Sequence, residues 1–306
     1  MKISIISPVY RAEKIIPELV RQIDQAVRSL SDDYEIILVD DGSPDQSWSE
    51  IQKETKKYPS LKGIKLSRNF GQHYAVTAAL NYASGEATII VDCDLQDQPE
   101  EIKKLIEAYK DGNEVIFTKR IVRRHSFFKA IYSAFFNFIF KWVSNKDFDV
   151  NAGSMVLIGK KARTAFLQIK DHDRLYLQLL KWVGFKNTTI PVNHSKRHSG
   201  KSTYNFIKLL KIALQGFTSF SNKLLYFSII LGLVFSAVAF ISILIIVILY
   251  FTQGFQSGWA SLISSIFLCT GIILVNIGIL GLYIGKTFNQ SKERPLYIVE
   301  QEINTE

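Results

Sequence analysis

The sequence predicts an α/β domain with a mostly parallel sheet, followed by a hairpin of two transmembrane helices. Two observations predict the domain: strand-like and helix-like patterns alternate through residues 1–120, and acidic turns follow two of the strands. One observation predicts the hairpin: residues 224–285 contain no Asp, Glu, Lys or Arg. The chain of 306 residues carries a net charge of +9, which by itself suits nucleic acid, anionic lipid or phosphate-bearing substrates.

Strands and helices are expected in regular order over the first 120 residues. Short β-rich runs predict strands at 2–8, 34–40, 63–67, 87–92 and 114–118. Helical spacing of apolar residues, or a Pro at the start, predicts helices at 16–30, 74–83 and 99–109, and another with Ser43 as its cap and Pro44 as its first residue. This alternation predicts a sheet covered by helices on both faces.

Two acidic turns are the first candidates for chemistry. Asp40 and Asp41 follow one predicted strand, and Asp92 and Asp94 follow another. Because parallel strands end at the same edge of a sheet, the two turns are expected to meet where such sheets bind ligands. Closely spaced carboxylates suit Mg²⁺ or Mn²⁺, which bind through one or two carboxylates plus substrate phosphates. An ordinary helix cap is the alternative for the second turn, and we expect Asp97 to be that cap.

The apolar C-terminal part divides into two stretches, 224–251 and 259–285. Each exceeds the roughly 20 residues needed to cross a membrane. Lysines and arginines flank the pair, which places both termini in the cytoplasm and residues 252–258 outside. Glycines at 271, 278, 281 and 285 allow close helix packing, so the hairpin is expected to be an anchor, with a homo-oligomer through it as a further role. The lack of ionisable groups disfavours a channel or transporter.

Five segments together resemble a known family. They are SPVY at 7–10, EIILVDDGSPD at 35–45, LSRNFGQHYAVTAAL at 66–80, DCDLQDQPEE at 92–101 and KERPLY at 292–297. In this order they resemble the membrane-anchored family 2 glycosyltransferases with a GT-A fold. The nearest group is the polyisoprenyl-phosphate glycosyltransferases, which includes bactoprenol glucosyltransferases and dolichol-phosphate mannose synthase.

The resemblance implies roles at the matching positions. Asp92 and Asp94 would hold the metal ion, Mg²⁺ or Mn²⁺, and would form the catalytic group together with Arg120. The other binding positions that it implies are Pro8, Tyr10, Asp40 and Asp41 for the nucleoside, Gln96 and Arg68 near the diphosphate, and Arg197 and Lys201 near the acceptor phosphate.

Two positions depart from the family pattern. Arg11-Ala12 replaces a common Asn-Glu pair, and Gly153-Ser154 replaces a Gly-Asp pair, which removes a candidate general base. The chemistry does not require that base, since a polyprenyl phosphate has a second pKa of about 6 and is already ionised at neutral pH. A single in-line displacement by its oxygen would invert the anomeric centre of the sugar.

Basic and aromatic residues intermix at 120–143 and 204–223. The first segment is expected to be an interfacial amphipathic helix, with an ordinary core-facing helix as the alternative, and the second a juxtamembrane helix leading into the first span. Because both segments belong to a membrane-anchored chain, membrane lipid is the expected partner, and nucleic acid is not.

The sequence thus predicts a catalytic GT-A domain at 1–203 and a tail at 286–306, both on the cytoplasmic side of the inner cell membrane. The expected reaction transfers one sugar from a nucleoside-diphosphate sugar to polyisoprenyl (undecaprenyl) phosphate. UDP-glucose is the first choice of donor, and GDP-mannose, UDP-N-acetylhexosamine and UDP-aminoarabinose derivatives are alternatives. Another lipid or glycan acceptor, or an inactive GT-A scaffold, also stays open. The end of the tail, RPLYIVEQEI, is expected to add a strand to its own domain or to a neighbour's.

Overall fold

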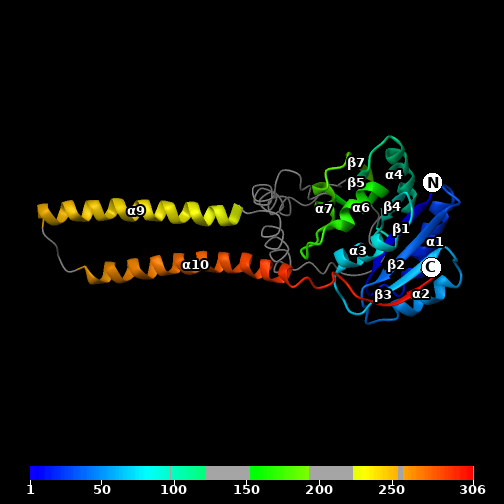
Figure 1. Cartoon of the computed structure of the whole chain (residues 1–306), viewed down its shortest axis with the longest axis horizontal. Helices are drawn as coiled ribbons and strands as arrows, with labels where there is room; N and C mark the ends of the chain where they lie inside the picture. Colours follow the sequence, from blue (N-terminus) through cyan, green and yellow to red (C-terminus); the bar gives the residue numbers. More distant parts are fainter. Residues whose placement is uncertain (97, 121–151, 193–222, 254–257, 306) are drawn as a thin grey trace, which may run out of the picture. The chain divides into compact units, whose positions relative to one another are not determined.

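The computed structural model describes residues 1–96, 98–120, 152–192, 223–253 and 258–305. They fall into two compact units (Figure 1). The first holds the described residues up to 192 together with those from Arg294 onward, and the second holds the two long helices that precede Arg294. The predicted segments 120–143 and 204–223 lie almost wholly outside the described residues, as do Asp97, Arg197 and Lys201.

The first unit is built on one sheet, whose described strands run in the order β7-β5-β6-β4-β1-β2-β3-β8. Strands β4, β1, β2 and β3 run parallel to one another, and β7 is parallel to β5. Strand β6 is antiparallel to β4 and β5, and β8 is antiparallel to β3. The prediction of a mostly parallel sheet is therefore confirmed. The strands are β1 Ile3–Val9, β2 Tyr34–Asp40, β3 Leu61–Leu66, β4 Ala87–Ile90, β5 Val115–Arg120, β6 Ala152–Gly159, β7 Asn187–Val192 and β8 Val299–Ile303.

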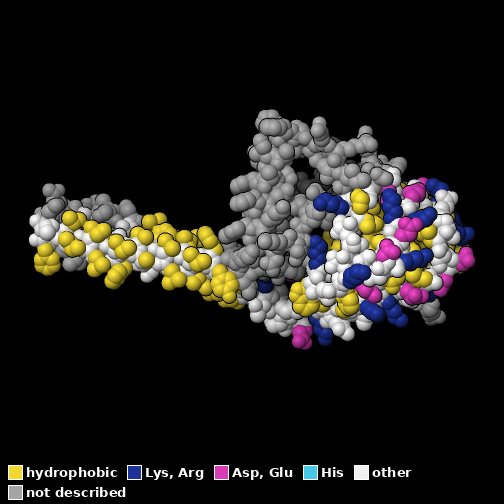
Figure 2. Space-filling view, turned by 90° about the horizontal axis from the view of Figure 1, so that it is seen from above, with side chains coloured by type: hydrophobic (Ala, Val, Ile, Leu, Met, Phe, Trp, Pro, Cys, Tyr) yellow, Lys and Arg dark blue, Asp and Glu magenta, His cyan; other side chains and the backbone are white. Residues whose placement is uncertain are grey.

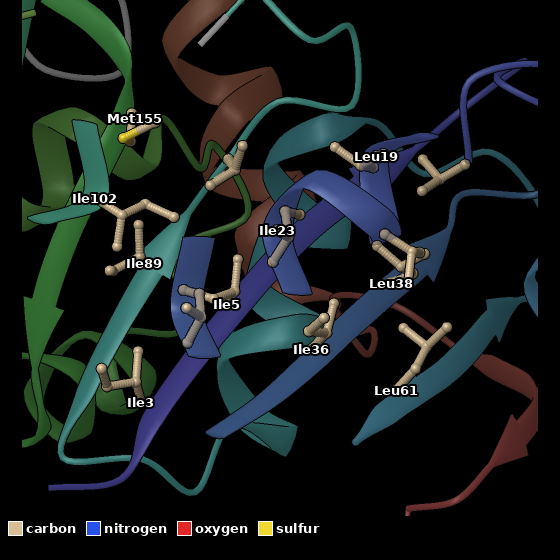
Figure 3. Packing of buried hydrophobic residues seen from close by; sticks show 14 of the residues in the cluster. Ile3, Ile5, Leu19, Ile23, Ile36, Leu38, Leu61, Ile89, Ile102 and Met155 are labelled. Atoms are coloured by element: carbon tan, nitrogen blue, oxygen red, sulfur yellow. The ribbon is translucent and has the colours of Figure 1, made fainter. Parts of the chain in front are cut away.

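Helices cover both faces of this sheet. The described helices of the first unit are α1 Ile16–Arg28, α2 Ser47–Thr55, α3 Gln72–Tyr82, the 3₁₀ turn η1 Pro99–Glu101 with α4 Ile102–Lys110, α6 Lys160–Gln168 and α7 Tyr176–Trp182. Buried side chains of α1, α2 and α4 share one core cluster with alternate strand residues such as Ile5 and Ile36 (Figure 3). Helix α3 also contacts β1 and β2, but none of its residues belongs to this cluster. Because strand side chains alternate between the two faces of a sheet, α3 covers the other face. Burial on both faces explains why β1 is apolar along most of its length.

One predicted helix start is wrong. α2 begins at Ser47, and not at Pro44 with Ser43 as its cap. The Ser43 hydroxyl instead accepts the backbone N–H of Arg11 at 3.1 Å. Asp45 accepts the backbone N–H and the hydroxyl of Ser47, at 3.2 and 2.6 Å. These bonds hold residues 43–46 as a loop, which delays the helix by one turn.

The pairing of strand β8 shows which domain the C-terminal tail joins. β8 runs antiparallel to β3 of the same chain, with Gly63 opposite Ile303 and Leu66 opposite Val299. The first of the two predicted alternatives, a strand added to its own domain, is the one that the structure adopts.

The second unit contains the helices α9, Lys223–Gln253, and α10, Trp259–Ser291. Both include a window long and apolar enough to span a membrane, Leu225–Ser242 and Ser265–Ser291, each with a mean hydropathy of 2.3. Figure 2 shows apolar side chains along these helices, whereas charged side chains gather on the first unit. Almost none of the residues in the two windows is buried against protein, which is typical of a surface that contacts lipid.

Candidate active site

The candidate site lies where the order of the strands reverses. Strand β1 has β2 on one side and β4 on the other, while β3 continues beyond β2. In open α/β sheets ligands bind at the carboxyl ends of the strands at such a switch point. The residues that follow these ends are Tyr10 after β1, Asp41 after β2 and, one residue beyond Val91, Asp92 after β4. The prediction that both acidic turns lie at one edge of the sheet is therefore confirmed.

Asp40 closes β2 in full burial. Its Oδ1 accepts the backbone N–H of Ser43 at 3.2 Å, while its Oδ2 has no hydrogen-bond partner among the described residues. Burial raises the pKa of this carboxyl, and the bonds from Ser43 only partly oppose the shift. A buried carboxylate oxygen without a donor is costly, so Asp40 holds a binding capacity that the described part of the chain leaves unused.

Asp41 has a different environment. Its two oxygens accept the backbone N–H groups of Phe70 and Gly71, at 2.7 and 2.8 Å. Burial raises its pKa, and the two N–H groups and Arg68 oppose that shift. Asp41 therefore fixes the start of α3, whose N-cap is Gly71 with a φ of 109°.

The segment Ser67–Gly71, here called the Arg68 loop, packs closely on the turn after β2. Gly42 has a φ of 61°, and a Cβ added there would lie 2.4 Å from the carbonyl carbon of Arg68. Only glycine suits that position. The Arg68 guanidinium lies over the Phe70 ring, with its Cζ 4.2 Å from the ring centre. The loop is therefore shaped by its contacts with Gly42 and Asp41.

The first residue of α3 connects the two acidic turns. Gln72 donates its side-chain N–H to Oδ1 of Asp92 at 2.8 Å. Three consecutive residues, Phe70 to Gln72, thus bind Asp41 and Asp92. Asp41 and Asp92 follow strands β2 and β4, which lie about 10 Å apart because β1 runs between them. The start of α3 bridges this distance. Gln72 was not singled out from the sequence, although its place in LSRNFGQHY, just after a strand, was a signal.

The acidic turn after β4 has a specific shape. Oδ1 of Asp94 accepts the backbone N–H of Gln96 at 3.1 Å, and Leu95 between them has a φ of 56°. Burial, together with the charges of Asp92 and Asp94, raises the pKa of Cys93 to about 12. Cys93 is therefore a neutral thiol packed against the core, which disfavours a role as a nucleophile.

Two predicted nucleoside contacts lie at the end of β1. Pro8 is buried within the strand, opposite Val39. Tyr10 comes one residue after the strand and is 42% exposed. The guanidinium carbon of Arg11 lies 5.4 Å from the centre of the Tyr10 ring, and Arg11 has a φ of 55°. The exposed ring of Tyr10 can therefore stack on a planar ligand group.

The acidic turn has the chemistry of a divalent-cation site that substrate must complete. The described residues hold no group of three or more His, Cys, Asp or Glu side chains that could bind a metal ion by themselves. They do provide the carboxylates of Asp92 and Asp94, which both act on the Cys93 thiol. Hard oxygen donors of this number suit Mg²⁺ or Mn²⁺, which takes further oxygens from a phosphate and from water.

The remaining predicted site residues are not brought to this edge of the sheet by described contacts. Arg120 ends β5, and β6 separates β5 from β4. The side chain of Arg120 lies outside the described part, as do Arg197 and Lys201. Their predicted roles at phosphate groups stay predictions.

Comparisons with known proteins match this arrangement. The model of the family "Glycosyl transferase family 2" matches residues 4–163. An uncharacterised glycosyltransferase, YkcC, of Bacillus subtilis is 34% identical over 99% of this chain and 94% of its own length. A prophage bactoprenol glucosyl transferase homolog of Escherichia coli is 32% identical over 98% and 99%. The undecaprenyl-phosphate 4-deoxy-4-formamido-L-arabinose transferase of Salmonella choleraesuis is 31% identical over 100% and 94%.

Solved structures agree on the fold. Glucosyl-3-phosphoglycerate synthase of Mycobacterium tuberculosis, solved with Mn²⁺, UDP and phosphoglyceric acid, superposes with a TM-score of 0.51 at 13% identity, over 71% of this chain and 76% of that one. The expected GT-A fold is confirmed, and so is the resemblance stated from the sequence motifs. The family match and the similarity along the whole chain show that this protein is a glycosyltransferase of family 2.

Proposed function

We propose that this glycosyltransferase moves one sugar from a nucleoside-diphosphate sugar to a polyisoprenyl phosphate at the cytoplasmic face of a membrane. One observation carries the proposal: a pair of metal-compatible carboxylates, Asp92 and Asp94, at the carboxyl edge of the sheet and two helices of membrane-spanning length and composition occur in the same chain. The relatives from Escherichia coli and Salmonella, whose names specify bactoprenol and undecaprenyl phosphate, support the lipid acceptor.

The donor would bind at the ends of β1, β2 and β4. Tyr10 offers an exposed ring to the base, and the buried Asp40, whose Oδ2 has no hydrogen-bond partner among the described residues, is proposed to lie beneath the nucleoside. Pro8 and Asp41 are proposed to line the same nucleoside site. The diphosphate would lie toward Asp92 and Asp94, with Arg68 and Gln96 beside it, and Arg120 is proposed for the same phosphates.

Catalysis in this arrangement consists mainly of positioning and charge stabilisation. Asp92 and Asp94 would hold a divalent cation, which would supply Lewis-acid stabilisation of the leaving diphosphate. Gln72 donates to Asp92 and thereby fixes the direction of that carboxylate. Arg68 adds positive charge close to Asp41. Together these side chains would hold the anomeric carbon ready for in-line attack, which accounts for much of such rate enhancements.

The acceptor phosphate would act as the nucleophile without a protein base. The absent carboxylate would stand at Ser154, next to Gly153, which lies in β6 against Thr118, where an added Cβ would be 2.2 Å from the Thr118 hydroxyl. The backbone at this point is packed against β5. A phosphate monoester is ionised at neutral pH, so its oxygen can attack directly and invert the anomeric centre.

Glucose is the first choice for the sugar, because the name of the Escherichia coli relative specifies a glucosyl transferase. The Salmonella relative makes a 4-formamido-arabinose derivative the second choice. GDP-mannose and UDP-N-acetylhexosamine are the other donors to test. The catalytic unit and both termini would lie in the cytoplasm, α9 and α10 would anchor them, and contacts along α10 would join copies into a homo-oligomer.

The test is an assay of the purified full chain with undecaprenyl phosphate, Mn²⁺ and a panel of labelled sugar nucleotides. We expect one labelled product, a sugar linked through one phosphate to the lipid, and no product when Mn²⁺ and Mg²⁺ are removed. Label on diacylglycerol or on a glycan would contradict the proposal that polyisoprenyl phosphate is the acceptor. Metal-dependent nucleotide binding without any transfer would support the alternative of an inactive scaffold.

A further inference from the structure

The C-terminal tail lies beside both elements that flank the Arg68 loop, strand β3 before it and helix α3 after it. The loop, Ser67–Gly71, connects the end of β3 to the start of α3. The backbone N–H of Ser67 donates to the carbonyl of Ile298 at 3.0 Å, so the tail binds the first residue of the loop. β8 then continues along β3 as the last described strand of the sheet, next to β3 in Figure 1.

Side chains add to the docking of this strand. Trp48 donates its indole N–H to Oε1 of Gln301 at 2.8 Å, and Lys65 lies 3.1 Å from Glu300. At the far end, Asn304 donates to the carbonyl of Leu61 at 3.1 Å. These contacts come from α2 and from both ends of β3, so the tail is specifically docked along its length.

The tail also contacts the helix on the other side of the loop. Burial raises the pKa of Tyr297, and a hydrogen bond with Asn81 in the last turn of α3 opposes that shift. Burial and the neighbouring Glu302 raise the pKa of Tyr82 to about 12. The tail therefore binds the strand that enters the Arg68 loop, at Ser67, and its Tyr297 and Glu302 lie near Asn81 and Tyr82 of the helix that leaves it.

The Arg68 loop in turn carries the donor-site contacts. Its Phe70 and Gly71 donate to Asp41, and the next residue, Gln72, donates to Asp92. Only seven residues, 292–298, connect β8 to the end of α10, the second membrane-length helix. The tail thus links the membrane anchor to the loop that joins the two acidic turns.

We propose that the C-terminal tail, through Ile298 and β8, is a positioning element for the donor site that holds the Arg68 loop against Asp41. This inference rests on the proposed function, because it assigns the donor site to the same edge of the sheet. It extends that function by making a segment beyond the membrane helices part of what sets donor affinity. The residues of the tail are positioning residues, since their contacts reach the site through Ser67 and α3.

The experiment compares three variants of the full-length, membrane-anchored chain with the unmodified protein. One ends at Tyr297 and so lacks residues 298–306, the second is Gln301→Ala, and the matched control is Asn304→Ala, which loses a tail contact far from the loop. In each, we would measure hydrogen exchange of the Phe70 and Gly71 amides, and KM for donor and for acceptor separately.

Loss of the tail should raise the KM for the donor about tenfold, as expected when bonds that order a binding loop are lost, with the KM for the lipid unchanged. The Phe70 and Gly71 amides should exchange faster, and those of Ile3–Val9 should not. Gln301→Ala should show the same pattern more weakly, and Asn304→Ala should not show it.

A purely structural tail would give a different result. Exchange would then rise in β3, while the Phe70 and Gly71 amides stayed protected and donor KM did not change, and that outcome would overturn the inference. If the unmodified chain transferred no sugar, the proposed function would fail, whereas the exchange of the Phe70 and Gly71 amides would still decide whether the tail holds the loop.

Discussion

The two ends of β2 carry buried acidic residues in opposite environments. At the amino end, Glu35 accepts the Ser4 hydroxyl at 2.6 Å and the backbone N–H of Ser84 at 2.6 Å, and it pairs with Lys62 at 3.0 Å. Burial alone would raise the pKa of Glu35, but the bonds from Ser4, Ser84 and Lys62 outweigh it and hold the pKa at about 2. This end of the strand stabilises the ionised carboxylate.

At the carboxyl end of the same strand, burial raises the pKa of both Asp40 and Asp41. Asp40 keeps one oxygen without a partner among the described residues, and Asp41 relies on two backbone N–H groups. The difference shows that one strand can stabilise the fold at one end and keep one buried carboxylate oxygen, Oδ2 of Asp40, without a partner among the described residues at the other. Buried carboxylates with raised pKa values and unmet hydrogen-bonding capacity are typical of functional sites, where a bound ligand supplies the missing partner.

The largest effect should appear in catalysis, at the carboxyl edge of the sheet, where the turn after β4 lies at the same edge as the carboxyl end of β2. Asp92→Asn and Asp94→Asn should each lower sugar transfer by about a thousandfold, because the cation and its stabilisation of the leaving group are lost. Thermal unfolding of the catalytic unit should not change by more than a few degrees. Transfer rates and unfolding curves of the same preparations check this, and near-normal transfer by either variant would refute the role of the turn.

The next largest effect concerns stability at the amino end. Glu35→Gln should lower the free energy of unfolding at pH 7 by about 2–3 kcal/mol, since a carboxylate with a lowered pKa stabilises the folded state. The contribution is complete above the ordinary pKa of 4.5 and is lost as the pH falls toward 2, so the variant and the unmodified chain should converge there. Chemical unfolding across this pH range measures it.

Donor affinity is the control for Glu35→Gln, and it should not change, because Glu35 lies at the opposite end of the strand from Asp40. A variant that kept its stability but bound the donor less well would reverse the proposed division between the two ends.

The smallest expected effect has the opposite sign. Asp40→Asn should raise the free energy of unfolding at neutral pH by about 1 kcal/mol, since it removes a buried charge whose pKa is raised. The gain should vanish as the pH falls through the ordinary pKa of 3.8, where the carboxyl is neutral in both states. Donor affinity should fall in the same variant. Asp40→Asn with lower stability and unchanged affinity would show that Asp40 is a structural residue like Glu35.

The sequence allowed the alternation of strands and helices to be predicted because the apolar runs of β1, β2 and β4 and the helical spacing in α1 are local patterns. The positions of Asp40, Asp41, Asp92 and Asp94 at one edge followed from parallel pairing. The start of α2 could not be predicted in this way, because the Ser43 hydroxyl bonds to Arg11, 32 residues earlier in the chain.

Other features depended on contacts between distant segments. Gln72 reaches Asp92 because α3, which leads from β3 to β4, lies over β1 and β2, and a local pattern does not specify that contact. The pairing of β8 with β3 joins residues more than 230 positions apart, as Lys65 and Gln301 show. The tail motif was recognised, but its partner strand required the structure.

The most direct test of the central claim is calorimetric binding of UDP and GDP to the full chain, with Mn²⁺ and with a chelator. We predict that one nucleotide binds only with Mn²⁺, that Glu35→Gln binds it equally well, and that Asp92→Asn and Asp94→Asn do not. Equal binding in the chelator, or unchanged binding by both aspartate variants, would contradict the assignment of a metal and diphosphate site to the carboxyl end of the sheet.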